Sequence, residues 1–272
     1  MAYDLHTHTS ASDGTYSPTA LVNKAVYMGL RGLAITDHDT VGGIEEAEKA
    51  ARLLPCTVIP GVELSTDWCD EEIHVLGYFI DCHQKSLLSV LDMLEAERWQ
   101  RGQKMVRKLK ELGMDISWAH VSSLAGFGVV GRPHVAQVMV SRGYVADVRE
   151  AFADYLSKGK PGYVCRAKLS PIQAIQVIRD AGGVAVLAHP GLLKNAGSIE
   201  TILSFGFDGI EVNYPQHDQQ QVRRLTSLAS VYKLAITGGS DFHGEIRSHN
   251  KLGACAVSEA MVKALKKKRE GN

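Results

Sequence analysis

The sequence has no apolar run long enough to cross a membrane and no excess of charge of either sign. Its longest apolar stretches, at residues 75–80 and 184–188, are far shorter than the roughly 20 residues that a membrane-spanning helix requires. Lys and Arg together number 30, and Asp and Glu together also number 30, so the formal net charge is zero. No overall field therefore attracts the chain to nucleic acid or to a membrane surface, and an anionic ligand would need a local site.

Cysteine is scarce and irregularly placed. Five cysteines, an odd number, are widely separated and form no Cys-x-x-Cys pair, which excludes both a disulfide framework and a zinc ribbon. We interpret them as reduced, mostly buried thiols: Cys56, Cys69, Cys82, Cys165 and Cys255. Residues 1–20 contain no apolar core of a secretory signal, so we expect a cytoplasmic protein.

Short apolar segments alternate with helical patterns over much of the chain. With 45% hydrophobic residues among 272, the chain has enough apolar material for a sizeable core. Seven segments are typical of strands: residues 2–6, 32–36, 57–63, 74–80, 184–188, 209–212 and 234–237. Helical spacing of apolar side chains occurs at residues 18–28, 44–54 and 170–181. This alternation predicts an α/β fold with a largely parallel sheet, whose functional groups gather at the carboxyl ends of the strands.

One connection is too short for a parallel pair. Only residues 64–73 join the third predicted strand to the fourth, whereas a parallel crossover needs about a dozen residues or more. We therefore expect these two strands to be antiparallel, which would bring Glu63, at the end of one, beside His74, at the start of the other.

The alternation stops between about residues 81 and 160, where helical patterns cover residues 86–112, 133–142 and 148–157. We interpret residues 83–159 as an inserted helical subdomain that caps the substrate. Residues 1–82 and 160–272 would together form the α/β domain.

Imidazole and carboxylate side chains follow several of the predicted strands. His6 and His8 are two residues apart, so in extended chain they point to the same side. Either they form a metal site with nearby carboxylates or they are a polar pair bonded to loops. His38, Glu63, His189 and the pair Asp241 and His243 end other predicted strands. Burying such a group without a hydrogen-bond partner or a bound ion costs about 2 to 7 kcal/mol, even when the group is neutral. The whole set therefore indicates a site for several metal ions.

These motifs, taken in order, resemble those of the polymerase and histidinol phosphatase (PHP) superfamily of metal-dependent phosphoesterases. The matching segments are residues 4–8 (DLHTH), 12–14 (SDG), 36–39 (TDHD), 61–63 (GVE), 74–77 (HVLG), 188–190 (AHP) and 239–243 (GSDFH). The resemblance implies a distorted seven-stranded β/α barrel of the TIM-like kind, with metal ions held in its mouth.

The resemblance also implies three ligand sets, of which the first two share Glu63. One metal would be held by His6, His8, Glu63 and Asp241, a second by Glu63, His74 and His189, and a third by Asp13, His38 and His243. Many members of the superfamily have a histidine where this chain has Asp13. Two or three divalent ions are expected, and mixtures of His and carboxylate suit manganese, iron and zinc alike.

Within the superfamily, the chain looks most like the branch of nucleoside 3′,5′-bisphosphate phosphatases and RNA 5′-exonucleases. That branch has Asp at the position of Asp13 and a helical insertion, and its pattern matches Gly131-Arg132-Pro133-His134. Arg132 offers a planar fork for a phosphate, and His134 stands in the first turn of a predicted helix, where backbone dipoles favour anions. Without the resemblance, the same residues would be typical of a loop that leads into a helix.

Basic and aromatic residues of the insertion allow two interpretations. Arg98, Arg101, Lys104 and Arg107 recur at three-residue spacing, which is typical of a solvated helix face; alternatively, Arg98 and Arg101 bind a second phosphate. Trp99, Phe127 and Tyr163 either stack on a nucleobase or pack in a core.

We therefore expect hydrolysis of nucleotide phosphomonoesters by a hydroxide that bridges two metals. The substrate would be a nucleoside 3′,5′-bisphosphate, cleaved to the 5′-monophosphate and phosphate, or a short 5′-phosphorylated RNA. Glu63 would bridge the metals, Arg132 would stabilise phosphate charge, and His38 or His134 would assist the leaving group. No membrane association, stable nucleic-acid complex or obligate protein partner is expected. The alternatives are a phosphatase of the histidinol phosphate type and a non-catalytic metal-binding regulatory module.

Overall fold

The computed structural model describes residues 2–69, 71–125, 130–165, 169–247 and 250–269. The chain divides into two compact units, one formed by Met1–Val90 with Lys168–Asn272 and the other by Leu91–Ala167. The bounds of the second unit differ at both ends from the expected insertion at residues 83–159. At the first boundary, one long helix runs through without a break. Among the described residues, no helix is long and apolar enough to cross a membrane.

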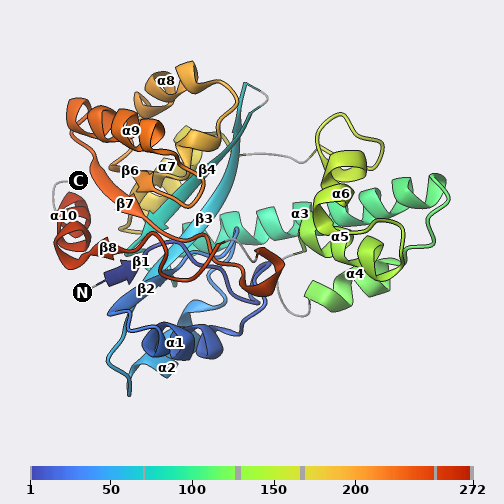
Figure 1. Cartoon of the computed structure of the whole chain (residues 1–272), viewed down its shortest axis with the longest axis horizontal. Helices are drawn as coiled ribbons and strands as arrows, with labels where there is room; N and C mark the ends of the chain where they lie inside the picture. Colours follow the sequence, from blue (N-terminus) through green and yellow to red (C-terminus); the bar gives the residue numbers. More distant parts are fainter. Residues whose placement is uncertain (1, 70, 126–129, 166–168, 248–249, 270–272) are drawn as a thin grey trace. The chain divides into compact units, whose positions relative to one another are not determined.

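The first unit contains a nearly closed, barrel-shaped sheet (Figure 1). Its strands are β1 (Ala2–Asp4), β2 (Gly32–Ile35), β3 (Thr57–Trp68), β4 (Glu71–Tyr78), β5 (Val184–Leu187), β6 (Gly209–Asn213), β7 (Ala235–Gly238) and β8 (Val257–Ser258). They follow the spatial order β7-β6-β5-β4-β3-β2-β1-β8. Beyond the strand ends, Leu5 N donates to Gly238 O at 3.3 Å, and a parallel bridge joins Thr7 to Phe242. These contacts bring the β1 side of the sheet to the β7 side.

The expected antiparallel pair is present, and it is longer than the sequence pattern predicts. β3 and β4 pair from Gly61 with Tyr78 to Trp68 with Glu71, so they form one hairpin that passes beyond the predicted ends at Glu63 and His74. Backbone hydrogen bonding continues here after the apolar pattern has stopped, which is why the pattern ended both strands too early. β4 is also antiparallel to β5. Its first residues therefore lie at the end of the barrel where the parallel strands finish.

All seven expected strands occur, and an eighth is added. β8 has only two residues and pairs antiparallel with β1, so it is too short to produce a recognisable pattern. β1 ends at Asp4, earlier than expected. The chain beyond it, which carries His6 and His8, is held by contacts with neighbouring loops rather than by a regular ladder.

Helices surround the sheet of the first unit (Figure 1). They are α1 (Pro18–Tyr27), α2 (Ile44–Ala51), α7 (Pro171–Asp180), α8 (Ile199–Leu203), α9 (Gln219–Val231) and α10 (Glu259–Arg269). α1 and α7 each begin with a Ser-Pro pair in which the serine oxygen accepts a backbone N–H of the first turn. This cap and the fixed φ of proline explain why the two helices start where the sequence predicts.

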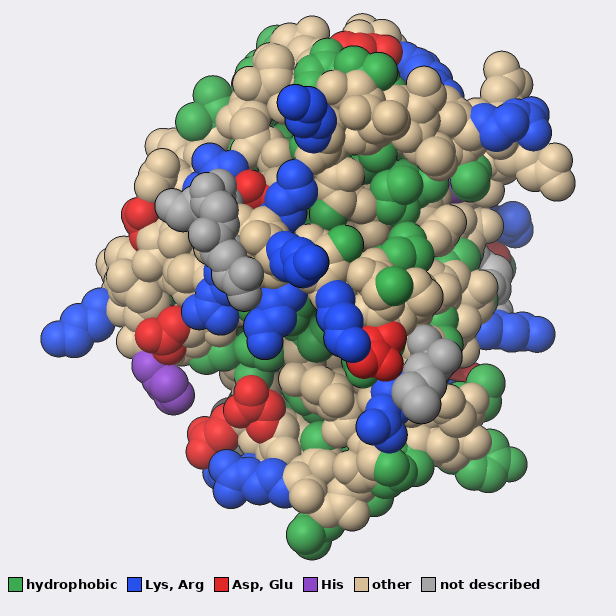
Figure 2. Space-filling view, turned by 90° about the vertical axis from the view of Figure 1, so that its left-hand side faces the viewer, with side chains coloured by type: hydrophobic (Ala, Val, Ile, Leu, Met, Phe, Trp, Pro, Cys, Tyr) green, Lys and Arg blue, Asp and Glu red, His purple; other side chains and the backbone are tan. Residues whose placement is uncertain are grey.

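α10 covers the end of the barrel where β5 and β7 begin. Leu265 is fully buried in the barrel core, and Lys268 Nζ donates to Lys233 O, just before β7, at 2.6 Å. Figure 2 shows the face on this side of the molecule, where Lys and Arg side chains gather in the middle. The last turn of α10 alone carries Lys266, Lys267, Lys268 and Arg269. Although the net charge is zero, the positively charged side chains are therefore unevenly distributed over the surface.

The second unit is helical. Its elements are α3 (Lys85–Glu111), which begins in the first unit, α4 (Trp118–Ala125), α5 (Arg132–Ser141), α6 (Val148–Ala151) and a π-helical turn over Phe152–Leu156. Residues from these elements share a separate core that includes Leu109, Val121, Val135 and Met139. The pattern at residues 148–157 thus contains two kinds of helix, and α4 was not predicted.

The cysteines form no disulfide within the described residues, but the expectation that most are buried is wrong. Only Cys56 is buried; Cys69 and Cys165 are exposed, and the other two are half-buried. Cys69 lies next to the hairpin tip and Cys165 in an irregular segment, so neither belongs to an apolar core.

Candidate metal centre

The ligand motifs meet because two short bridges extend the sheet past its strand ends. Thr7, between His6 and His8, pairs with Phe242, which stands between Asp241 and His243. Residues on either side of a bridged residue point to the opposite face from it. The two pairs therefore face the same side. A second bridge joins His38 directly to Glu63.

Glu63 lies at the centre of the cluster, and it is 1% exposed. Its Oε2 is 3.3 Å from His6 Nε2, 3.2 Å from His8 Nε2 and 3.1 Å from His38 Nδ1. Its Oε1 is 2.8 Å from His74 Nδ1 and 3.1 Å from His189 Nε2. One carboxylate thus contacts five imidazoles that come from four separate segments of the chain.

The described side chains form three groups whose ligand atoms lie within 4.8 Å of one another. The first group is His6, His8, Glu63 and Asp241, the same four residues that the resemblance assigns to one metal. The second group is His38, Glu63 and His74, whereas His189 was expected where His38 stands. His189 still reaches Glu63 Oε1. The third group joins His8 to the expected Asp13, His38 and His243.

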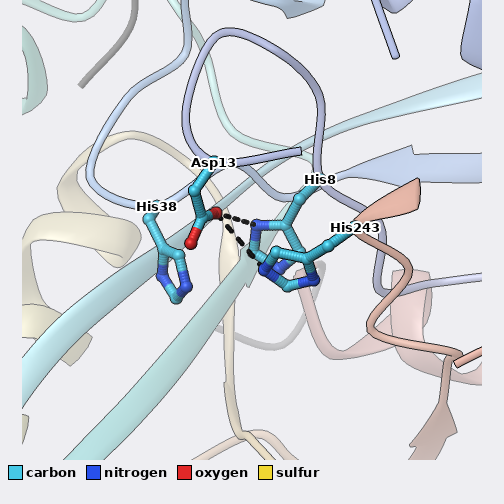
Figure 3. Close-up of side chains that lie close together, drawn as sticks. All are labelled: His8, Asp13, His38 and His243. Atoms are coloured by element: carbon cyan, nitrogen blue, oxygen red, sulfur yellow. Dashed lines mark ion pairs between the residues drawn. The ribbon is translucent and has the colours of Figure 1, made fainter. Parts of the chain in front are cut away.

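The third group is drawn in Figure 3. Asp13 Oδ1 is 3.3 Å from His243 Nε2 and 3.9 Å from His8 Nδ1. The His8 and His243 rings stack with centroids 4.0 Å apart. Asp13 is therefore brought into the cluster and is more than a turn-forming residue.

Burial and opposite charge act against each other on these groups. Burial alone would raise the pKa of Glu63, but the neighbouring His38, His74 and His6 hold it well below its usual range. Burial lowers the pKa of His74, yet the Glu63 carboxylate outweighs this and raises it to about 9. The pKa of His8 is likewise raised to about 9 against burial, by Asp241 and Glu63. At neutral pH the Glu63 carboxylate is ionised and favours protons on these imidazoles, and a metal ion that binds there would displace them.

His38 differs from its neighbours. Burial lowers its pKa to about 3, and the attraction of Glu63 and Asp13 does not offset this. The imidazole of His38 is therefore neutral at pH 7. In that form it is ready to bind a metal without losing a proton.

The donor set fits divalent metal ions. Several buried atoms of the cluster make no hydrogen bond within the part of the chain that the structure describes: His6 Nε2, His8 Nδ1 and Nε2, His38 Nδ1, His74 Nε2 and Glu63 Oε2. Unsatisfied polar groups of this kind are costly and rare in proteins. Imidazole nitrogens mixed with carboxylate oxygens are ligands for zinc, iron and manganese.

Two ligand positions have a strained backbone. His189 has φ 29° and Asp241 has φ 50°, in the left-handed region that non-glycine residues seldom adopt. Such strain persists only where surrounding contacts impose it, and it is common at functional sites. For Asp241, one such contact is Tyr214, whose hydroxyl donates to Oδ2 at 2.8 Å.

Buried aspartates hold the two loops that carry further ligands. Asp37 accepts from Thr9 N, Thr9 Oγ1 and Ser12 Oγ at 2.6–2.7 Å, which fixes the loop before Asp13. Asp4 accepts from Ser240 N and Oγ at 2.9 and 2.6 Å, next to Asp241. Both aspartates lie within the motifs noted above, but their supporting role was not predicted. Glu211, a lone carboxylate within the apolar β6, was also missed.

In the second unit, Arg98 and His134 lie close to Gly131, which precedes Arg132 in the sequence. His134 is in the first turn of α5, as expected, and its Nδ1 accepts from Gly131 N at 3.0 Å. Arg98 Nη1 lies about 4 Å from where a Cβ on Gly131 would be. The Arg132 guanidinium is 5.5 Å from the centre of the Phe152 ring. Because His134 Nδ1 accepts a hydrogen bond, its Nε2 carries the ring hydrogen and can donate a hydrogen bond.

The basic stripe of α3 is not one solvated face. Lys104 and Arg107 are exposed, but Arg101 is buried, and its Nε donates to Val164 O at 2.8 Å. Three-residue spacing drifts around a helix of 3.6 residues per turn, so the stripe passes from the core of this unit to solvent.

The aromatic residues also differ from one another. Trp99 is 42% exposed, and it packs edge-on against Trp118 with centroids 4.9 Å apart. Tyr163 lies beside the Arg101 guanidinium, 5.8 Å from it. Phe127 is outside the described residues.

Comparison with known proteins agrees with this geometry. A family profile described as the PHP domain matches residues 4–161. The chain is 39% identical over 250 residues to the 5′-3′ exoribonuclease Rnm of Salmonella typhimurium, covering 89% of this chain and 85% of that protein. It is 34% identical over 251 residues to the 3′,5′-nucleoside bisphosphate phosphatase of Chromobacterium violaceum, covering 88% and 86%. A solved structure from Bifidobacterium adolescentis, assigned as a metal-dependent phosphoesterase, matches with a TM-score of 0.91 and 31% identity, covering 98% and 96%.

Proposed function

The chain belongs to the PHP domain family, and on that premise we propose that it is a metal-dependent phosphoesterase that removes the 3′-phosphate of nucleoside 3′,5′-bisphosphates. The observation that carries this proposal is the cluster of imidazoles and carboxylates around Glu63. Nine side chains were expected to hold metal, and all nine lie in or against this cluster.

The residues of the cluster would hold two or three divalent ions. Bound there, such ions lower the pKa of a water molecule towards about 7 and place positive charge against phosphate oxygens. Glu63 presents one oxygen to His6, His8 and His38 and the other to His74 and His189. That arrangement suits a carboxylate shared by two ions. Manganese, iron and zinc all remain compatible with these ligands.

The second unit would bind phosphate. Arg132 carries a permanent positive charge on a planar fork that matches a phosphate oxygen pair. Arg98, which lies near Gly131 with it, would bind the same or a second phosphate. Arg101 is buried and donates to Val164 O, so we propose that it acts through the position of that segment. His134, with the hydrogen on Nε2, would donate a hydrogen bond to the departing oxygen as it gains negative charge. His38 is the weaker candidate for this step, because it lies among the expected metal ligands.

A short 5′-phosphorylated RNA is the second candidate substrate. The observation that favours it is the similarity to proteins named as 5′-3′ exoribonucleases. Both candidates share a nucleotide with a terminal phosphate, so the same metal cluster and basic residues would serve them. The zero net charge favours small substrates over a stable complex with long RNA.

The test measures phosphate and nucleotide release by the purified protein with added manganese and then with excess chelator. The substrates are adenosine 3′,5′-bisphosphate, AMP, histidinol phosphate and a short 5′-phosphorylated RNA. Chelator-sensitive release of the 3′-phosphate from the bisphosphate is the expected result. Stepwise release of nucleotides from the RNA would show that RNA is a substrate as well. Preference for histidinol phosphate would replace the nucleotide proposal. Bound metal without turnover of any substrate would favour a regulatory module.

A further inference from the structure

Glu211 is the only carboxylate of β6, and it lies wholly inside the protein, behind the metal ligands. Its exposed fraction is 0%. Oε1 is 3.0 Å from His6 Nδ1, and Oε2 accepts the backbone N–H of His189 at 2.8 Å. Each oxygen therefore serves a different ligand residue.

The contact with His6 decides which nitrogen of that ring is available. A carboxylate oxygen accepts hydrogen bonds, so this contact fits a His6 ring that carries a hydrogen on Nδ1. Nε2 is left to face Glu63 Oε2, 3.3 Å away, and Asp241 Oδ1, 3.5 Å away. Outer carboxylates that hold a ligand histidine in this way set its orientation and its tautomer.

The contact with His189 acts on the backbone. The φ of 29° at His189 is strained, so this peptide needs contacts that hold it. Glu211 supplies one at the N–H. His217 supplies another, because its Nε2 accepts from Gly191 N at 3.0 Å. In this position His189 Nε2 reaches Glu63 Oε1 at 3.1 Å.

We propose that Glu211 is a positioning residue that couples two metal sites, by holding the ring of His6 for one and the backbone of His189 for the other. The inference rests on the proposed function in that both histidines are taken to bind metal. It extends that function by assigning one buried carboxylate to both sites. Loss of Glu211 should therefore weaken both sites together.

Glutamine has nearly the same shape as glutamate, but it cannot accept hydrogen bonds from both His6 and His189. A carboxylamide has one accepting oxygen and one donating NH2 group. In either orientation the NH2 group would face a donor, which is His6 Nδ1–H or His189 N–H. Glu211→Gln thus keeps the volume of the side chain and mismatches one of its two contacts.

The experiment compares wild type, Glu211→Gln and a matched control, Glu200→Gln, which removes an exposed carboxylate paired with Arg224. Manganese content is measured after dialysis, and manganese affinity by competition with a chelator. We expect Glu211→Gln to lose about ten- to hundredfold in manganese affinity, the usual effect of removing such an outer contact. The control should match wild type.

A second measurement does not depend on metal or on turnover. With 15N-labelled histidine, the metal-stripped wild-type protein should show a slowly exchanging Nδ1 proton on His6, and Glu211→Gln should lose it or show faster exchange of the His189 amide. If Glu211→Gln fails to fold, Glu211→Asp retains the charge but is one methylene shorter, and it should show an intermediate loss of affinity. Wild-type manganese affinity together with an unchanged Nδ1 proton and His189 amide in either variant would overturn the inference. If wild type itself takes up no manganese, the proposed function fails, while the Nδ1 proton and the His189 amide still decide whether Glu211 positions these two histidines.

Discussion

Replacing Glu63 with glutamine tests the centre of the site most directly. The substitution keeps the size of the side chain and removes the charge that faces five imidazoles. We expect the variant to lose metal from the groups that contain Glu63 and to lose turnover by about a thousandfold or more, which corresponds to roughly 4 kcal/mol of transition-state stabilisation.

The same variant should also change how the stability of the metal-stripped protein depends on pH. The pKa of His74 is about 9 in the folded protein, against about 6.5 in an unfolded chain. A raised pKa stabilises the fold fully below about pH 6.5, and this contribution is lost as pH rises through about 9. Without Glu63, burial would dominate and lower the pKa of His74. At about 1.4 kcal/mol per pKa unit, Glu63→Gln should cost up to about 3 kcal/mol at pH 6 and little at pH 9.5.

Urea unfolding at pH 6 and pH 9.5 in excess chelator measures this difference. Glu259→Gln, which removes an exposed carboxylate paired with Lys263, serves as the control and should show no such change with pH. A destabilisation that is equal at both pH values would refute the electrostatic reasoning. Near-normal turnover with metal added would refute the role of Glu63 as a shared ligand.

Three further predictions concern other residues of the metal cluster, of its supporting loops and of the second unit. Manganese should bind more tightly as pH rises from 6.5 to 9, because His8 and His74 must each lose a proton to the solution; titration calorimetry in several buffers would show proton release, and pH-independent binding would contradict it. Asp37→Asn should destabilise the protein by about 3 kcal/mol, since it weakens three hydrogen bonds to a buried charge; urea unfolding measures the loss, and a change below about 1 kcal/mol would refute the role of Asp37 in holding its loop. Arg132→Ala should raise KM for the bisphosphate about ten- to hundredfold with metal content unchanged, because a charged hydrogen bond to phosphate contributes about 1.5 to 3 kcal/mol; an unchanged KM would exclude phosphate binding by Arg132.

Most of the fold could be predicted from the local sequence pattern, and each error of that prediction has a local cause. Strands in the first unit are short apolar runs, so their positions follow from burial on both faces. The β3–β4 hairpin extends past Glu63 and His74 because backbone pairing does not require apolar side chains. The short β8 leaves no periodic signal at all. In α3, the three-residue spacing predicted that Arg101 lies on a solvated helix face, but the packing of the second unit buries it.

The types of ligand and their order along the chain were readable from the sequence alone. Histidines and carboxylates stand directly after apolar segments, and the carboxyl ends of parallel strands meet at one end of a barrel. A cluster was therefore predictable without coordinates. The resemblance to the PHP superfamily then assigned residues to particular metals.

Only the tertiary structure decided which groups touch. That His38 lies against Glu63, that Asp13 approaches His8 and that Glu211 contacts both His6 and His189 all depend on sheet order, register and loop contacts. Such distances join residues as far apart as His6 and Glu211, so no local propensity encodes them. The physical reason is that sequence pattern determines the face on which a side chain lies, whereas the packing of the whole barrel determines what it meets there.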